Sequence, residues 1–207
     1  LNTLSGHTGW VGSAVYSPDG QQVLTASNDG TVRLWNATTG SPLGQPLKHV
    51  NEQGALDPVY TARFSPDGLT IASGTGSGTL VVWNASNSSN RAEIWRAKGH
   101  EKAIRSVAFS PDGTSIVTAG ADGAVKVWDA ATGEPAAPES LVGHTGVVFS
   151  ARYSPDGSKI VTTSQDGTIR VWDASTGKVV KTLVGHGPGL LTSDGVIDAA
   201  FNPDLPG

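Results

Sequence analysis

The tetrapeptide SPDG occurs four times in this chain, beginning at residues 17, 65, 110 and 154, and a related NPD begins at residue 202. Successive motifs are 48, 45, 44 and 48 residues apart. A repeat of this length indicates an array of supersecondary units, each of which must stack on a neighbour to bury its apolar face. The repeat therefore restricts the possible folds more than any other feature of the sequence.

Each repeat has the pattern of short antiparallel strands. An apolar segment leads into Pro-Asp-Gly, which favours a tight turn. A second segment then runs to Asp-Gly, a preferred hairpin turn, and apolar residues alternate along the third segment. A weaker fourth segment follows, and no segment has a helical period over a useful length. We therefore predict an all-β fold of four-stranded propeller blades, in which the first strands cover residues 11–16, 59–64, 104–109 and 148–153.

The order of these motifs resembles the WD40 repeat. Gly-His begins at residues 6, 99, 143 and 185, and Trp-Asp begins at 128 and 172, whereas the first two repeats carry Trp-Asn. The regular SPDG turns are similar to those of bacterial WD40 arrays, which often form one end of a large multidomain protein. The resemblance implies one partial propeller domain over residues 1–207, with blades at 6–48, 49–98, 99–142 and 143–184 and partial blades at 1–5 and 185–207.

A closed WD40 ring has about seven or eight blades. The resemblance therefore leads us to expect that the remaining blades come from the same polypeptide or from another chain.

A histidine, a hydroxyl residue, an aspartate and a tryptophan recur at fixed positions of the repeat. The first three are also the components of a nucleophilic triad. All five histidines of the chain occupy this one position, so none is left as a general base or metal ligand. The resemblance implies that the set is a buried structural hydrogen-bond network, and we predict no catalytic residue, metal or cofactor. The members of this polar network are His7, Thr25, Asp29 and Trp35; His49, Ser73 and Trp83; His100, Thr118, Asp122 and Trp128; and His144, Thr162, Asp166 and Trp172.

The second repeat departs from the pattern. Ser77 stands where the other repeats have the turn aspartate, so an aspartate at this position is expected to stabilise the blade. The loop after the histidine is six residues longer here and in the fifth repeat than in the others. These insertions carry Glu52, Asp57 and Asp194, which predicts an acidic contribution to the face on which the loops lie.

Residues that the repeat does not require are candidates for partner binding. Aromatic residues cluster at the start of the first strands, and an arginine takes the matching place in the third repeat. In WD40-like propellers this region opens onto the face around the central channel, where partners dock, and aromatic residues and arginine dominate interface hot spots. The alternative is that these side chains pack between blades. The candidates are Trp10, Tyr60, Arg105 and Phe149, together with Asn28 and Gln165 before the Asp-Gly turns.

The composition narrows the classes of partner. The net charge is −4 and there is no run of basic residues, which opposes nucleic-acid binding. No stretch approaches the roughly 20 apolar residues that cross a bilayer. The absence of cysteine fits a reducing compartment and favours the cytoplasm.

We predict a non-enzymatic module that binds a protein or peptide and forms the sensor or adaptor part of a larger protein. The alternative is the propeller portion of an enzyme whose active site lies in the channel or in an attached domain.

Overall fold

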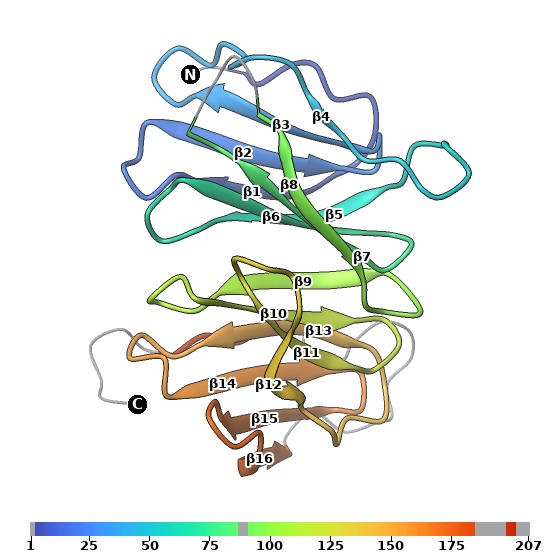
Figure 1. The fold of residues 1–207 in the computed structure, drawn as a ribbon, viewed down its shortest axis with the longest axis vertical. Coiled ribbons are helices and arrows are strands. Elements are labelled where there is room, and N and C mark those ends of the chain that lie inside the picture. The colour runs from blue at the N-terminus through green and yellow to red at the C-terminus, as the bar shows by residue number, and fades with distance from the viewer. Residues whose placement is uncertain (1–2, 87–90, 185–197, 202–207) are drawn as a thin grey trace.

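The computed structural model describes residues 3–86, 91–184 and 198–201, which form sixteen β-strands and no helix. The strands make four separate four-stranded antiparallel sheets, and within each sheet neighbouring strands are consecutive in the chain. The sheets follow one another from the top to the bottom of Figure 1. The predicted all-β fold is confirmed.

The sheets have the following strands. The first contains β1 (Val11–Tyr16), β2 (Gln22–Ser27), β3 (Thr31–Asn36) and β4 (Leu47–Lys48). The second contains β5 (Val59–Phe64), β6 (Thr70–Thr75), β7 (Thr79–Asn84) and β8 (Glu93–Lys98). The third contains β9 (Ile104–Phe109), β10 (Ser115–Gly120), β11 (Val125–Asp129) and β12 (Pro135–Ser140). The fourth contains β13 (Val148–Tyr153), β14 (Lys159–Ser164), β15 (Thr168–Asp173) and β16 (Val179–Val184).

The SPDG motif makes the turn between the first two strands of each sheet. In the first sheet Ser17 Oγ donates a hydrogen bond to Asp19 Oδ1 at 2.5 Å. Gly20 has a φ of 71°, a left-handed conformation that glycine adopts without steric cost. The side chains of Ser65, Ser110 and Ser154 repeat this hydrogen bond in the other sheets.

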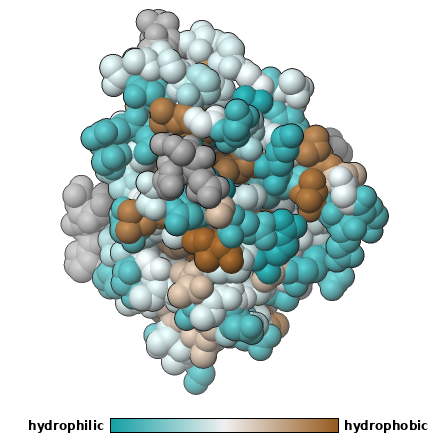
Figure 2. Space-filling model, turned by 45° about the horizontal axis from the view of Figure 1, so that its top comes forward, coloured by the Kyte–Doolittle hydropathy of each residue, from teal (hydrophilic) through white to brown (hydrophobic). Residues whose placement is uncertain are grey.

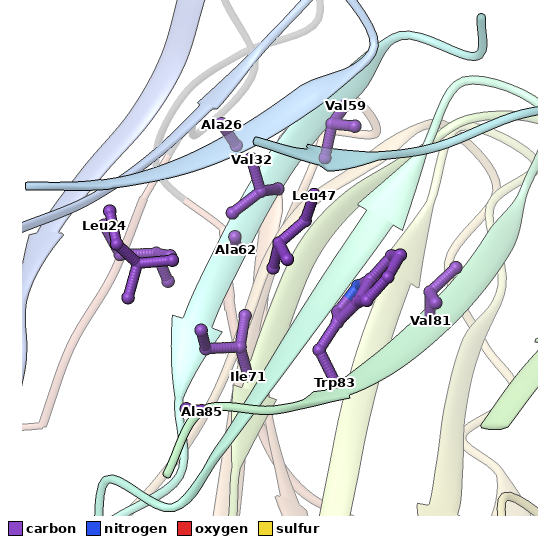
Figure 3. Packing of buried hydrophobic residues seen from close by; sticks show 11 residues of the cluster. Leu24, Ala26, Val32, Leu47, Val59, Ala62, Ile71, Val81, Trp83 and Ala85 are labelled. Carbon is purple, nitrogen blue, oxygen red and sulfur yellow. The ribbon is translucent and has the colours of Figure 1, made fainter. Parts of the chain in front are cut away.

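Apolar side chains fill the space between successive sheets. Ile71 and Val59 of the second sheet are fully buried against Leu24 and Val32 of the first. Figure 3 shows this cluster gathered between the two sheets. Burying one such side chain stabilises the fold by about 1.5–3 kcal/mol relative to leaving it exposed. Equivalent clusters join the second sheet to the third and the third to the fourth.

In three of the sheets the apolar residues at every second position of the third strand are buried, but in β7 the intervening Val81 is buried as well. Val32 and Leu34 of β3 are buried, as are the matching residues of β7 and β11. Ile169 and Val171 of β15 are only half-buried, because no fifth sheet packs against them among the described residues.

Exposed hydrophobic side chains gather on the outer strand β16, where Val179, Val180, Leu183 and Val184 are all exposed. Figure 2 shows small, separate hydrophobic patches among hydrophilic residues on the face in view. The described chain has no helix that is long and apolar enough to span a bilayer.

Candidate functional site

The polar network lies at the same place in the first, third and fourth sheets. In the fourth sheet His144 Nδ1 is 2.8 Å from Asp166 Oδ2, and His144 Nε2 is 2.7 Å from Thr162 Oγ1. The indole Nε1 of Trp172 donates to the same Thr162 oxygen at 2.8 Å. The first sheet joins His7, Thr25, Asp29 and Trp35 at 2.7–2.8 Å, and the third joins His100, Thr118, Asp122 and Trp128 at 2.8–3.0 Å.

The hydrogen-bond pattern shows which ring nitrogen of each network histidine carries the proton. A carboxylate only accepts, so the imidazole Nδ1–H donates to the aspartate and Nε2 accepts from the threonine hydroxyl. Burial lowers the pKa of His100 and of His144, and this effect exceeds the opposite effect of the nearby aspartates. The lowered pKa favours the neutral imidazole that this arrangement needs. The order of groups is that of a nucleophilic triad, but Thr118 and Thr162 are completely buried beneath a tryptophan. The hydroxyls are therefore out of reach of a substrate.

The network aspartates also hold the loop that carries each histidine. Asp29 Oδ2 accepts a hydrogen bond from the backbone N–H of Thr8 at 3.0 Å, and Asp29 Oδ1 accepts from the hydroxyl of Thr31 at 2.6 Å. Burial raises the pKa of the Asp29 carboxyl, but these hydrogen bonds and the one from His7 outweigh burial and bring the pKa to about 2. The carboxylate thus connects the histidine loop to the hairpin between the second and third strands.

The second sheet builds this site differently. His49 Nε2 is 2.7 Å from Ser73 Oγ, and Trp83 Nε1 donates to the same oxygen at 3.1 Å. His49 Nδ1 is buried and makes no well-aligned hydrogen bond to a described residue, although the backbone carbonyl of Leu47 is near enough to raise the pKa of the imidazole slightly against the effect of burial. Burial lowers the pKa of His49 to about 4. The link from histidine to turn aspartate is therefore missing in this sheet.

Asp57 takes over one function of the missing turn aspartate. Its Oδ1 accepts from the backbone N–H of Ser77 at 3.0 Å, and its Oδ2 accepts from the Ser77 hydroxyl at 2.6 Å. Asp57 is only 5% exposed, so the expectation that it adds negative charge to the surface is wrong. Of the other two acidic residues in the insertions, Glu52 is exposed and Asp194 lies outside the described residues.

The insertion of the second repeat forms a small hairpin at the edge of the sheet. Val50 and Leu56 make an isolated bridge, and Asn51 N–H donates to Ala55 O at 2.9 Å. Arg96 of the outer strand β8 donates to Val50 O at 3.3 Å. The hairpin thus contacts the outer strand of the second sheet.

The second residue of every first strand is the extra residue of a β-bulge. The register passes from Val59 directly to Thr61 in β5, which leaves Tyr60 unpaired. The same shift leaves Arg105 unpaired in β9 and Phe149 in β13. A bulge redirects a side chain away from the alternation of its strand. Three of the candidate partner-binding residues thus occupy structurally equivalent, bulged positions.

Trp10 does not occupy the equivalent position in the first sheet. The bulged residue of β1 is Gly12, and Trp10 precedes the strand. A Cβ atom at Gly12 would lie 2.8 Å from Cζ3 of Trp10, so the indole ring covers this glycine. Trp10 is nevertheless 65% exposed. Trp10 thus lies two residues before the position of Tyr60 and Phe149, and its ring lies over the bulge of β1.

Three of the six candidates line one concavity of about 310 Å³, which is formed by Asp198 and the first strands of the four sheets, β1, β5, β9 and β13. We call these four strands the inner strands. These three are Tyr60, Arg105 and Phe149. The guanidinium of Arg105 lies over the ring of Tyr60, 4.8 Å from its centroid. Trp10, Asn28 and Gln165 are exposed, but they are not among the residues that line the concavity.

The structure adds three charged residues that the sequence reasoning did not select for this concavity: Arg63, Arg152 and Asp198. Arg152 Nε and Nη2 donate to the two carboxylate oxygens of Asp198 at 3.0 and 2.9 Å. Ser150 Oγ also donates to Asp198 Oδ1, at 2.7 Å. The sequence does carry a signal for the two arginines. Arginine is the fifth residue of β5 and of β13, whereas the fifth residue is valine in β1 and alanine in β9.

The sequence of these repeats matches a known family. A family model described as "WD domain, G-beta repeat" matches residues 1–36, 44–84, 92–129 and 138–173. The chain belongs to the WD40 family.

Individual WD40 relatives match only short parts of the chain. A "Nuclear distribution protein PAC1" of Arthroderma otae is 39% identical over 62 residues, which is 28% of this chain and 13% of that protein. A "Lissencephaly-1 homolog 1" of Paramecium tetraurelia is 50% identical over 36 residues, or 17% of this chain and 9% of that protein. A "Ribosome biogenesis protein WDR12 homolog" of Chlamydomonas reinhardtii is 35% identical over 57 residues, or 27% of this chain and 13% of that protein. The matched segments thus cover less than a sixth of each of these relatives.

The described part of this WD40 chain contains no group of three His, Cys, Asp or Glu side chains that could hold a metal ion. Its histidines are engaged in the polar network, and their hydroxyl partners are buried. Among the candidate residues of the inner strands, Arg105 is exposed, and Tyr60 and Phe149 are half-buried.

Proposed function

We propose that this WD40 chain is a non-enzymatic protein-interaction scaffold, and that a partner protein docks where the inner strands open around Tyr60, Arg105 and Phe149. The observation that carries the proposal is the set of bulges. The same backbone irregularity recurs in each sheet, and in three sheets it places a large aromatic or arginine side chain at the concavity. These residue types supply most of the binding energy at protein interfaces.

The surrounding residues support a broader docking face. Trp10 exposes most of its indole ring beside the bulge of β1. Asn28 N–H donates to Trp10 O at 2.9 Å, and Gln165 N–H donates to Val147 O at 2.8 Å. These backbone bonds hold Asn28 and Gln165 beside the start of the first strands. A partner that covers the concavity can therefore also contact these exposed side chains.

The scaffold belongs, in this proposal, to the sensor or adaptor part of a larger multidomain protein. The names of the relatives connect those proteins with nuclear distribution and ribosome biogenesis. The matched segments are short, so the proposal for this chain rests on the residues of its own inner strands.

Affinity capture with the full-length protein tests the docking face. Proteins captured from an extract of the source cells by the wild type are compared with those captured by Tyr60→Ala and Phe149→Ala. A specific partner should be lost with both variants and retained with Val184→Ala, which alters an exposed apolar residue of the outer strand β16. Equal capture by all four proteins would contradict the proposal.

A further inference from the structure

The residues that line the concavity are mainly positively charged, although the protein as a whole is acidic. Among the described residues, three arginines line it, Arg63, Arg105 and Arg152, together with one carboxylate, that of Asp198. The guanidinium groups therefore exceed the carboxylates by two, whereas the whole chain has a net charge of −4. A cleft with one sign of charge attracts groups of the opposite sign.

A carboxylate already occupies part of this concavity. Arg152 binds Asp198 through two parallel N–H···O hydrogen bonds, and Ser150 adds a third. This two-pronged arrangement is the geometry in which a guanidinium recognises a carboxylate most specifically. The side chains here are thus suited to a carboxylate by size and by donor direction.

The other two arginines keep donor capacity after their contacts within the chain. Arg63 Nη1 donates to Ser13 Oγ at 2.7 Å and to Ala62 O at 2.9 Å. Burial lowers the pKa of Arg63, and the positive charge of Arg152 lowers it further. Arg105 stacks on Tyr60 and donates no hydrogen bond to another described residue. An incoming anion would relieve the repulsion between Arg63 and Arg152.

We propose that the concavity binds an acidic side chain, Asp or Glu, of the partner protein, with Arg105 as its main contact. This inference rests on the proposed docking function and specifies the chemistry of the partner. Tyr60 and Phe149 flank the arginine, so the recognised segment places an acidic residue beside apolar contact area. Asp198 occupies Arg152 from within the chain and so competes with the incoming side chain for that arginine.

A binding assay with a defined probe tests the inference. A fluorescein-labelled oligoglutamate peptide and its oligoglutamine counterpart are titrated with the full-length protein, and fluorescence anisotropy is measured at low and at raised salt. We expect oligoglutamate to bind, salt to weaken the complex, and oligoglutamine not to bind. Arg105→Gln should weaken binding of oligoglutamate about tenfold, as expected for loss of one charge-assisted hydrogen-bond donor. Asp198→Asn should strengthen it several-fold because the internal competitor is neutralised.

Two matched variants separate a site from a general effect of net charge. Lys181→Gln removes one positive charge from the exposed outer strand β16, and Glu139→Gln removes one negative charge from the exposed strand β12. Both should bind oligoglutamate as the wild type does. Equal losses in Arg105→Gln and Lys181→Gln, equal gains in Asp198→Asn and Glu139→Gln, or binding of oligoglutamine would overturn the inference.

Failure of this inference can be told apart from failure of the docking function. If oligoglutamate does not bind but Phe149→Ala abolishes affinity capture of a partner, the acidic chemistry is wrong and the docking face stands. If oligoglutamate binds as expected but capture is unchanged by Tyr60→Ala and Phe149→Ala, the proposed docking function is wrong.

Discussion

Asp57 and Ser77 form a hydrogen-bonded pair in which the serine hydroxyl donates to the carboxylate at 2.6 Å. Ser77 occupies the turn position that is aspartate in the other three sheets, and Asp57 comes from the insertion that only the second sheet has among the described repeats. The carboxylate also accepts from the backbone N–H of Ser77. The insertion thus returns a carboxylate to the turn from a different direction, although His49 remains without its partner.

This pair reverses the expectation that an aspartate at position 77 stabilises the second sheet. In Ser77→Asp two carboxylates would face each other in a half-buried site and repel. We expect the free energy of unfolding to fall by about 1–3 kcal/mol, measured by chemical denaturation at neutral pH. Gln53→Asp adds the same charge at an exposed position of the insertion and should leave stability nearly unchanged.

Neutralising the opposing group should rescue the variant. Asp57→Asn in the Ser77→Asp background restores a single carboxylate beside a neutral hydrogen-bonding group, so it should recover most of the lost stability. A stable Ser77→Asp single variant would show that Asp57 does not hold the position described.

Thr162 and Thr163 offer a matched test of the polar network. Both are fully buried in β14, but Thr162 Oγ1 binds His144 and Trp172, whereas Thr163 Oγ1 has no hydrogen-bond partner among the described residues. Thr162→Val should destabilise by about 2 kcal/mol or more because it leaves two buried groups unpaired. Thr163→Val should be neutral or stabilising because it removes an unpaired hydroxyl. Equal denaturation midpoints for the two variants would argue against the network as the source of stability.

The strands were predictable because their turns are chemically specified. Pro-Asp-Gly and Asp-Gly fix the turns, and the repeat supplies independent copies of the pattern, so the first strands begin and end where the sequence predicts. The contacts of the network residues follow the same repeat. Asp57 was not predictable because it pairs with a residue 20 positions away through an insertion with no described counterpart. The bulges were not predictable because a bulge interrupts the alternation of a strand by only one residue.

Alanine substitutions of Trp10 and Trp128 should distinguish a surface residue from a core residue. Trp128 is 5% exposed and donates to Thr118 Oγ1 at 2.9 Å, whereas Trp10 is 65% exposed. Trp128→Ala should lower the free energy of unfolding by about 3–5 kcal/mol, as expected for a buried tryptophan. Trp10→Ala should cost less than about 1 kcal/mol while weakening partner capture. Equal shifts in melting temperature would contradict this division.

The buried imidazole of His49, which lacks a carboxylate partner, should make stability fall at moderately acidic pH. Burial lowers its pKa from 6.5 to about 4 in the folded state, so the unfolded chain binds more protons between these values. Its contribution is complete above pH 6.5 and is lost as the pH falls towards about 4. At about 1.4 kcal/mol per pKa unit the loss is about 3 kcal/mol. His100 and His144 act in the same direction, so the measurement is the difference between the wild type and His49→Gln in unfolding free energy across this range. Glutamine does not titrate, and its curve should be flatter than that of the wild type; parallel curves would show that His49 is not the buried neutral group described.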